Sequence, residues 1–300
     1  MTKEERLVVD NRVVVEERNG ELVVAGEQEQ EHGRTVEERF ATRIRLNVPS
    51  RDNPKVARLI EMANADDELY ALWLAGNVNA VERMGMTDHG PVHVKIVMNI
   101  ASKLLRMLVA HGVEPGVVRN YGMTPADAEV VVVLASLLHD TGMSIHRPNH
   151  EEFSLFVAQA KVKRILEDLY DLRTATILRS EVLHAIIAHR SNGRPLTPEA
   201  GIVRVADALD MTKGRSRIPV SAGSVSIHSL SAAAIESVEI ATGTEKAVRL
   251  SIRMSNSAGV FQLDQLFREK LAGSGLERYI EVEAEVEGDT ERRLLGAYHM

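Results

Sequence analysis

The sequence contains no cysteine, and this absence limits the chemistry that the protein can use. Disulfides, thiolate metal sites and cysteine nucleophiles are all excluded. Any metal ion must therefore be bound by carboxylates and by some of the 11 histidines. An excess of basic residues is missing too, since 36 Lys and Arg stand against 43 Asp and Glu, a net charge of -7. The chain thus lacks the broad basic surface that binds nucleic acid, although a local basic pocket for phosphates stays possible.

Long apolar runs and several familiar motifs are also absent. The longest apolar run, Val130 to Leu138, is far shorter than the ~20 residues that span a bilayer. The N-terminal stretch MTKEERLVVD has no apolar signal core, so we expect a cytoplasmic protein with no membrane partner. No serine stands in a Gly-x-Ser-x-Gly setting, and neither a Gly-rich phosphate loop nor a dinucleotide fingerprint is present.

The 300 residues have the composition of an average globular protein, with 44% hydrophobic and 26% charged residues. The length favours about two domains. The pattern of the chain divides it into three parts, 1–48, 50–218 and 220–300. We expect a mainly α fold, in which a helical bundle carries a small N-terminal β region and a C-terminal α+β domain.

The N-terminal part, residues 1–48, has the pattern of β structure. Val13–Val15 and Leu22–Val24 flank Asn19-Gly20, a dipeptide typical of hairpin turns. Alternating apolar residues from Phe40 to Val48 predict a further strand. No chemistry is visible here, so we expect a small sheet that packs on the main body or on a partner subunit.

Residues 50–218 show apolar positions at helical spacing and predict roughly seven helices. Thr124-Pro125 begins one of them, with Asp127 completing a capping box, and this helix continues into the buried run that ends at Leu138. In the C-terminal part, Val248–Met254 and Ile280–Val286 predict strands and Phe261–Leu271 a helix. These elements predict a small sheet with a helix on one face. We expect the boundary between the helical part and this C-terminal domain near residues 219–223.

The most distinctive dipeptide is His139-Asp140, two metal-ligand residue types at the end of a buried helix. A buried charge needs a partner or a metal ion. The alternative interpretation is a helix C-terminus with a histidine near the helix dipole. Four more ligand-type residues lie at or near apolar stripes: His93, His150, His189 and Asp207. One such histidine is more often a satisfied core residue, but this number together predicts a metal site at the centre of the bundle.

The order His93, His139-Asp140, Asp207 resembles the HD-domain metal-dependent phosphohydrolase superfamily, over about residues 85–217. The segments that carry the resemblance are His93–Val97, Leu137–Gly142, Ala188–Gly193 and Ile202–Asp207. His150 and His189 match the extra histidines of the dinuclear branch. That branch includes symmetrical dinucleoside tetraphosphate hydrolases and cyclic-dinucleotide phosphodiesterases with a GYP motif. Asn192-Gly193-Arg194-Pro195 stands where that motif would be, so the resemblance does not extend to cyclic di-GMP hydrolysis.

The resemblance implies a ligand set of six side chains: His93, His139, Asp140, His150, His189 and Asp207. Six are too many for one tetrahedral ion, but they suit two divalent ions if Asp140 bridges them. Imidazole and carboxylate ligands favour Mn, Fe, Ni, Zn, Co or Mg. Two such ions clamp a phosphate and activate a water for attack on it. A mononuclear site needs only His93, His139, Asp140 and Asp207, and this alternative stays open.

Further candidates surround this set. We predict catalytic roles for Asp140, Asp207 and His89, which lies four residues before His93, although His89 could equally be an exposed loop histidine. The candidates for binding substrate phosphate are His146, Arg147, Arg190, Lys213 and Arg215. Arginine donates bidentate hydrogen bonds to phosphate oxygens. A basic cluster such as Lys213 and Arg215 is more often a solvated surface.

The sequence therefore favours a metal-dependent phosphohydrolase or phosphodiesterase that hydrolyses a nucleotide or a related small phosphoester. The alternative is a regulatory sensor that binds metal and nucleotide with little or no turnover. A third reading, a structural bundle with coincidental histidines, predicts no bound metal. RNA cleavage is disfavoured because no RNA-binding module is recognisable and the net charge is negative. By resemblance to other helical HD cores we expect a homo-oligomer, with a dimer as the simplest case.

Overall fold

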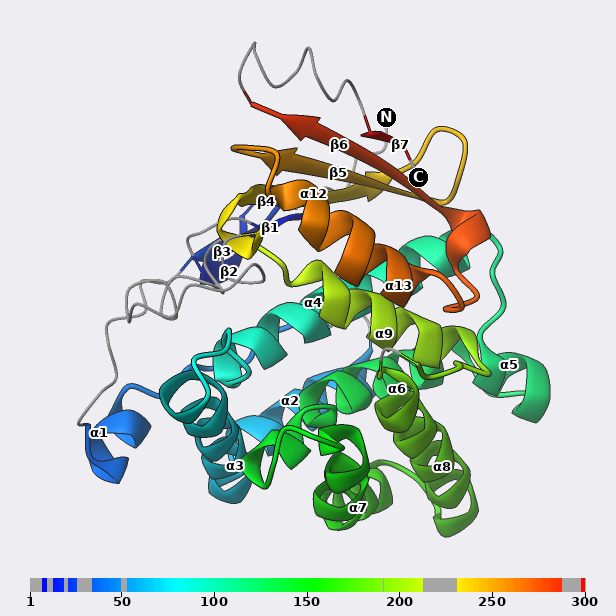
Figure 1. The fold of residues 1–300 in the computed structure, drawn as a ribbon. Helices are drawn as coiled ribbons and strands as arrows, with labels where there is room; N and C mark the ends of the chain where they lie inside the picture. Colours follow the sequence, from blue (N-terminus) through cyan, green and yellow to red (C-terminus); the bar gives the residue numbers. More distant parts are fainter. Residues whose placement is uncertain are drawn as a thin grey trace.

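A bundle of helices and a seven-stranded sheet form two layers, with short helices between them (Figure 1). This computed structural model describes residues 7–9, 13–18, 21–25, 34–49, 53–190, 192–212, 231–287 and 298–299. The prediction of a mainly α fold is confirmed. Among the described residues, no helix has both the length and the apolar character needed to cross a lipid bilayer.

The seven helices predicted for the central part are all present, although α8 begins earlier than its sequence pattern indicated, and the structure adds the short helix α5, Gly116–Tyr121. The others are α2 Pro54–Asn64, α3 Asp67–Asn77 continued by the π-helix η1 Val78–Arg83, α4 Pro91–Ala110, α6 Pro125–Leu138, α7 His150–Leu169, α8 Leu172–Ala188 and α9 Pro198–Leu209. A 3₁₀ turn, η2 Thr141–Ser144, follows α6. Proline occupies the first turn of α2, α4, α6 and α9, where its fixed φ suits a helix and its missing N–H costs nothing.

Helix α6 is the central helix of the bundle. Its residues from Asp127 to Leu138 are all buried, and apart from Asp127, Glu129 and Ser136 they are apolar, which leaves no polar face for water. The predicted capping box is present at its start, where Thr124 and Asp127 bond each other's backbone N–H groups. At its other end, the helix delivers His139 and Asp140 into the interior, where both are buried.

The sheet has the strand order β2-β3-β1-β4-β5-β6-β7. The strands are β1 Leu7–Val9, β2 Val13–Arg18, β3 Glu21–Ala25, β4 Ile235–Thr242, β5 Val248–Met254, β6 Ile280–Val286 and β7 Tyr298–His299. β2 and β3 pair antiparallel, as the hairpin pattern predicted, and β1 pairs antiparallel with β4. One sheet thus contains strands from the first and last of the three expected parts, while the domain boundaries themselves stay predictions.

Between β5 and β6 the chain forms the continuous helical segment that the sequence predicted. Its pieces are α12 Gly259–Phe261, the π-helix η3 Gln262–Phe267 and α13 Arg268–Leu271. The segment connects two parallel strands and lies between the sheet and α9 (Figure 1). Leu263 and Phe267 are buried in the same core as the apolar residues of β5 and β6. This packing places α13 beside the end of the bundle that carries Asp207.

The expected strand from Phe40 to Val48 is wrong. Residues 36–41 form α1, Val36–Ala41, which a capping box between Thr35 and Glu38 begins. Residues 43–49 pass along the bundle without forming a strand, and Leu46 shows why. Its N–H and C=O are both bonded by the side-chain amide of Asn64, at 2.8 and 2.9 Å, so they are not available to a neighbouring strand. The expected boundary near residues 219–223 lies outside the described residues.

Candidate metal centre

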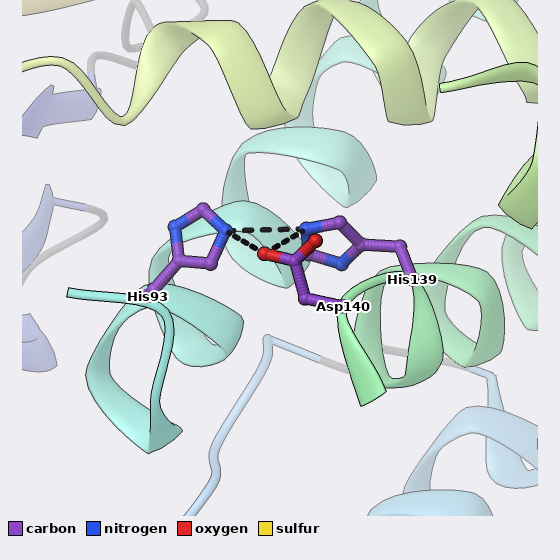
Figure 2. A group of neighbouring side chains, drawn as sticks. All are labelled: His93, His139 and Asp140. Atoms are coloured by element: carbon purple, nitrogen blue, oxygen red, sulfur yellow. Dashed lines mark hydrogen bonds and ion pairs between the residues drawn. The ribbon is translucent and has the colours of Figure 1, made fainter. Parts of the chain in front are cut away.

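The ends of five helices converge on one place in the bundle. His139 and His189 are the C-terminal caps of α6 and α8, and His150 is the first residue of α7. His93 lies in the first turn of α4, and Asp207 lies in the last turn of α9. The four histidines are between 0% and 4% exposed. Figure 2 shows His93, His139 and Asp140 pointing toward one another from α4 and the end of α6.

Asp140 lies between two pairs of histidines. Its Oδ2 is 3.3 Å from Nε2 of His93 and 3.4 Å from Nε2 of His139 (Figure 2). Its Oδ1 is 3.2 Å from Nε2 of His150 and 3.6 Å from Nε2 of His189. The two carboxylate oxygens therefore face two separate groups, each of which has the ligand spacing of a metal site.

Asp207 joins the group that contains His93 and His139. Its Oδ1 lies 3.5 Å from Nε2 of His93 and 3.8 Å from Nε2 of His139. All six residues of the expected ligand set are thus brought together. Their donor atoms are imidazole nitrogens and carboxylate oxygens, which fit Mn, Fe, Ni, Zn or Co better than Ca. Asp140 belongs to both groups of possible metal ligands.

The outward-facing ring nitrogens of the histidines are held by oxygen acceptors. Nδ1 of His139 lies 2.8 Å from the carbonyl of Ser136, and Nδ1 of His189 lies 2.6 Å from that of Ile186. Nδ1 of His93 lies 2.7 Å from Oδ2 of Asp210. An acceptor at Nδ1 assigns the hydrogen to that nitrogen and leaves the Nε2 lone pair facing the site. This is the arrangement that orients metal-binding histidines.

Nδ1 of His150 has acceptors on Glu151 and on the backbone carbonyl of Arg147, but the guanidinium of Arg147, a donor, also lies beside it. Oε2 of Glu151 lies 3.0 Å from Nδ1 of His150. Burial raises the pKa of Glu151, but His150 outweighs it and lowers that pKa to about 2, so this carboxylate stays ionised. The sequence analysis missed both Glu151 and Asp210. Their spacing, next to His150 and three residues after Asp207, was the signal that could have identified them.

Burial and charge compete within the cluster. Burial raises the pKa of Asp140, but hydrogen bonds and charge from His139 hold it well below its ordinary value. Burial also lowers the pKa of His139 and of His150, yet neighbouring carboxylates raise these values to about 10 and about 9. For His189 burial prevails, and its pKa is lowered. Protons on His139 and His150 thus balance the buried carboxylates, a task that a divalent cation can take over.

Close packing between η2 and α7 brings His150 to Asp140. The hydroxyl of Ser154 donates to the carbonyl of His139 at 2.6 Å and accepts from the N–H of Gly142 at 2.8 Å. A Cβ on Gly142 would lie 2.0 Å from the carbonyl oxygen of His150. Only glycine therefore permits this approach, which explains the residue that follows His139-Asp140-Thr141.

The remaining candidates differ in how close they lie to the cluster. His89 precedes α4 rather than belonging to it; its ring is buried, bonded to the carbonyl of Thr87, and its centroid lies 5.6 Å from that of His93. The guanidinium of Arg147 lies 2.6 Å from Nδ1 of His150. His146 is exposed, and Arg190 pairs with Glu152 at the surface. Lys213 and Arg215 lie outside the described residues.

The sequence analysis did not predict that Lys270 contacts the cluster. Its Nζ lies 3.1 Å from Oδ2 of Asp207 and donates to the backbone carbonyl of His189. The residue comes from α13, in the C-terminal part of the chain. Nothing in the pattern of Phe261–Leu271 distinguishes this lysine from other charged residues of that helix.

Comparisons with known proteins agree with this geometry. The family described as "HD domain" matches residues 92–212, a segment that contains all six residues of the cluster. The "Uncharacterized protein MJ1020" of Methanocaldococcus jannaschii is 44% identical over 211 residues, which cover 70% of this chain and 82% of that protein. No solved structure matches the chain. The chain therefore belongs to the HD-domain family, whose members are generally metal-dependent hydrolases.

Proposed function

We propose that the protein is a phosphohydrolase that uses two divalent metal ions to hydrolyse a small phosphoester of the nucleotide class. The observation that carries the proposal is the position of Asp140. Each of its carboxylate oxygens faces a different pair of imidazoles, at 3.2 to 3.6 Å. In this assignment His93, His139 and Asp207 would hold one ion, His150 and His189 would hold the other, and Asp140 would contribute one carboxylate oxygen to each.

The side chains around the ligands would support this chemistry. When bound, a pair of divalent ions supplies positive charge for a phosphate and lowers the pKa of water, so that attack at neutral pH needs no strong protein base. Asp210 and Glu151 keep His93 and His150 oriented. His89 lies beside His93 and is our candidate for proton transfer to the leaving group. Arg147, next to His150, is our candidate for holding a phosphate oxygen.

The second candidate function is a sensor that binds metal and nucleotide with little turnover. The observation in its favour is that the C-terminal segment contacts the cluster through Lys270, and that the strands flanking this segment belong to the sheet. A sheet tied to the site in this way can report its occupancy. Turnover separates the two functions, because a sensor binds nucleotide with metal but does not release product.

The test is a hydrolysis panel on the purified full chain. The substrates are phosphomonoesters, phosphodiesters, cyclic nucleotides, cyclic dinucleotides, dinucleoside polyphosphates and nucleoside triphosphates, each with Mn, Ni, Mg, Co or Fe(II). We expect metal-dependent hydrolysis of one substrate class by the wild type and none by the double variant His139→Ala/Asp140→Ala. Activity that survives in this variant, or in chelator, would contradict the proposal. Metal and nucleotide binding with no product in any reaction would favour the sensor.

A further inference from the structure

The C-terminal segment is attached to one side of α9 at three successive positions about one turn apart. These are Gly201, Arg204 and Asp207. A Cβ on Gly201 would lie 2.3 Å from the carbonyl oxygen of Ser274, so the two backbones approach as closely as glycine allows. Figure 1 shows α13 beside α9. The last of these three positions, Asp207, is also a residue of the candidate metal centre.

Arg204 fixes the geometry of this attachment. It is 2% exposed, and its guanidinium donates to backbone carbonyls on two sides, four of them in the part of the chain that the structure describes. Two belong to Glu269 and Lys270 in α13, at 2.9 and 2.8 Å. The other two belong to Arg190 and Gly193 in the loop after α8, at 2.6 and 2.7 Å. One buried cation therefore holds α13 against the loop that follows His189, which sets the position of the Lys270 backbone.

From this position the side chain of Lys270 makes two contacts with the centre. Its ammonium lies 3.1 Å from Oδ2 of Asp207 and donates to the carbonyl of His189. Both side chains of the ion pair are largely shielded from water, with 16% and 15% exposure. A carboxylate can rotate and exchange its two oxygens, but a charge-assisted hydrogen bond to one of them fixes its orientation. Here that bond takes Oδ2 and leaves Oδ1 facing His93 and His139.

We propose that Lys270 is a positioning residue of the metal centre, supplied by the C-terminal segment, which holds Asp207 so that Oδ1 faces the ion between His93 and His139. The inference rests on the proposed function, because it assigns Asp207 as a ligand. It adds that the centre is incomplete without α13. The centre thus extends beyond residues 92–212, the part that matches the HD domain.

Positioning and simple charge predict opposite effects when Lys270 is neutralised. A cation beside the site repels a divalent ion, so removing a lysine that acts only through its charge would tighten metal binding. Removing a lysine that orients a ligand weakens metal binding, typically by about 10- to 100-fold for residues that support a ligand. The sign of the change therefore identifies the role.

The experiment titrates the metal-free full chain with Mn²⁺ by calorimetry, with equilibrium dialysis to count bound ions. The variants are Lys270→Met, Lys270→Arg and the control Arg268→Ala, whose exposed side chain lies on the same short helix. In Lys270→Met we expect one Mn²⁺ to bind about 10- to 100-fold more weakly. The second ion, between His150 and His189, should be affected much less. Lys270→Arg should restore most of the loss, and Arg268→Ala should match the wild type.

The outcomes are distinguishable. Wild type that binds no Mn²⁺ would overturn the proposed function and this inference together. Wild type that binds two ions, with Lys270→Met binding them equally or more tightly, would overturn the role of Lys270 alone. Thermal unfolding of the metal-free proteins checks that each variant folds. If Lys270→Met does not fold, Lys270→Ala, which also removes both the charge and the hydrogen-bond donor, replaces it with the same expected loss.

Discussion

Two clusters of buried charge lie in the same bundle, and their contacts differ in kind. Between α3 and α7, Nζ of Lys161 donates to both oxygens of Asp66, at 2.8 and 2.9 Å, and to Glu68 at 2.6 Å. In the metal centre, by contrast, Nε2 of His93 and Nε2 of His139 face each other at 3.1 Å. The first cluster pairs donors with acceptors. The second brings lone pairs together, which only a proton or a metal ion can satisfy.

The comparison shows how a stabilising cluster can be separated from a functional one. Burial raises the pKa of Asp66, but hydrogen bonds and charge from Lys161 outweigh it and lower the pKa. Asp66 also caps α3 by accepting from the N–H of Leu69. Each charge there has a permanent protein partner. Asp140, by contrast, is paired only with histidines among the described residues, and its charge depends on protonated imidazoles that a dication can replace.

The largest expected effect is from Asp140→Asn. The change keeps the shape of the side chain but removes the charge of the residue that we propose as the bridging ligand, so we expect loss of metal binding and a fall in hydrolysis of at least about 100-fold. Unfolding of the metal-free variant by denaturant should show little loss of stability, because the imidazoles can then be neutral. The same variant retaining full activity would contradict the assignment.

The matching change in the first cluster is Asp66→Asn. Asparagine still caps α3, but the buried ammonium of Lys161 loses its main partner, so we expect stability to fall by about 3 kcal/mol. Metal binding should not change. Denaturant unfolding measures the first effect and calorimetry the second. Asp168→Asn is the control, since it breaks an exposed pair with Arg58 that should contribute below about 1 kcal/mol.

Gly142→Ala should lower both the stability of the fold and the affinity for metal. The added Cβ cannot be accommodated against the carbonyl of His150, so η2 and α7 must separate. We expect about 2 kcal/mol of lost stability and weaker binding of the ion between His150 and His189. Chemical denaturation and Mn²⁺ titration test these together. Alanine at Gly112, where φ is +87° and the surroundings are open, is the control that changes backbone strain alone.

The smallest expected effect is on pH dependence. With pKa values of about 10 for His139 and about 9 for His150, both imidazoles are protonated at pH 7 in the metal-free protein. Metal binding at pH 7 should therefore release a proton from each, and affinity should rise with pH until these groups lose their protons. Calorimetry in buffers of different ionisation enthalpy measures the release. Binding without proton release at pH 7 would contradict these values.

The sequence was sufficient to predict the seven main helices of the bundle and to select the six cluster residues, because ionisable side chains on apolar stripes are conspicuous. The short helices α1 and α5 were not predicted. Asp210 and Lys270 were not selected from the sequence, because their roles depend on tertiary contacts. Asp210 faces His93 from α9, and Lys270 reaches Asp207 from a separate part of the chain. The prediction of a strand at Phe40–Val48 was wrong for the same reason. The side chain of Asn64, 18 residues further along the chain, bonds the backbone at Leu46. Pairing of β1 with β4 is likewise a long-range contact that no local pattern encodes.

The central claim is that Asp140 bridges two ions, and electron paramagnetic resonance of the Mn²⁺-loaded protein tests it most directly. We predict two ions per chain with the exchange-coupled spectrum of neighbouring Mn²⁺ ions, and loss of this spectrum in Asp140→Asn. Arg268→Ala should leave the spectrum unchanged. One ion per chain, or two uncoupled ions that persist in Asp140→Asn, would contradict the claim.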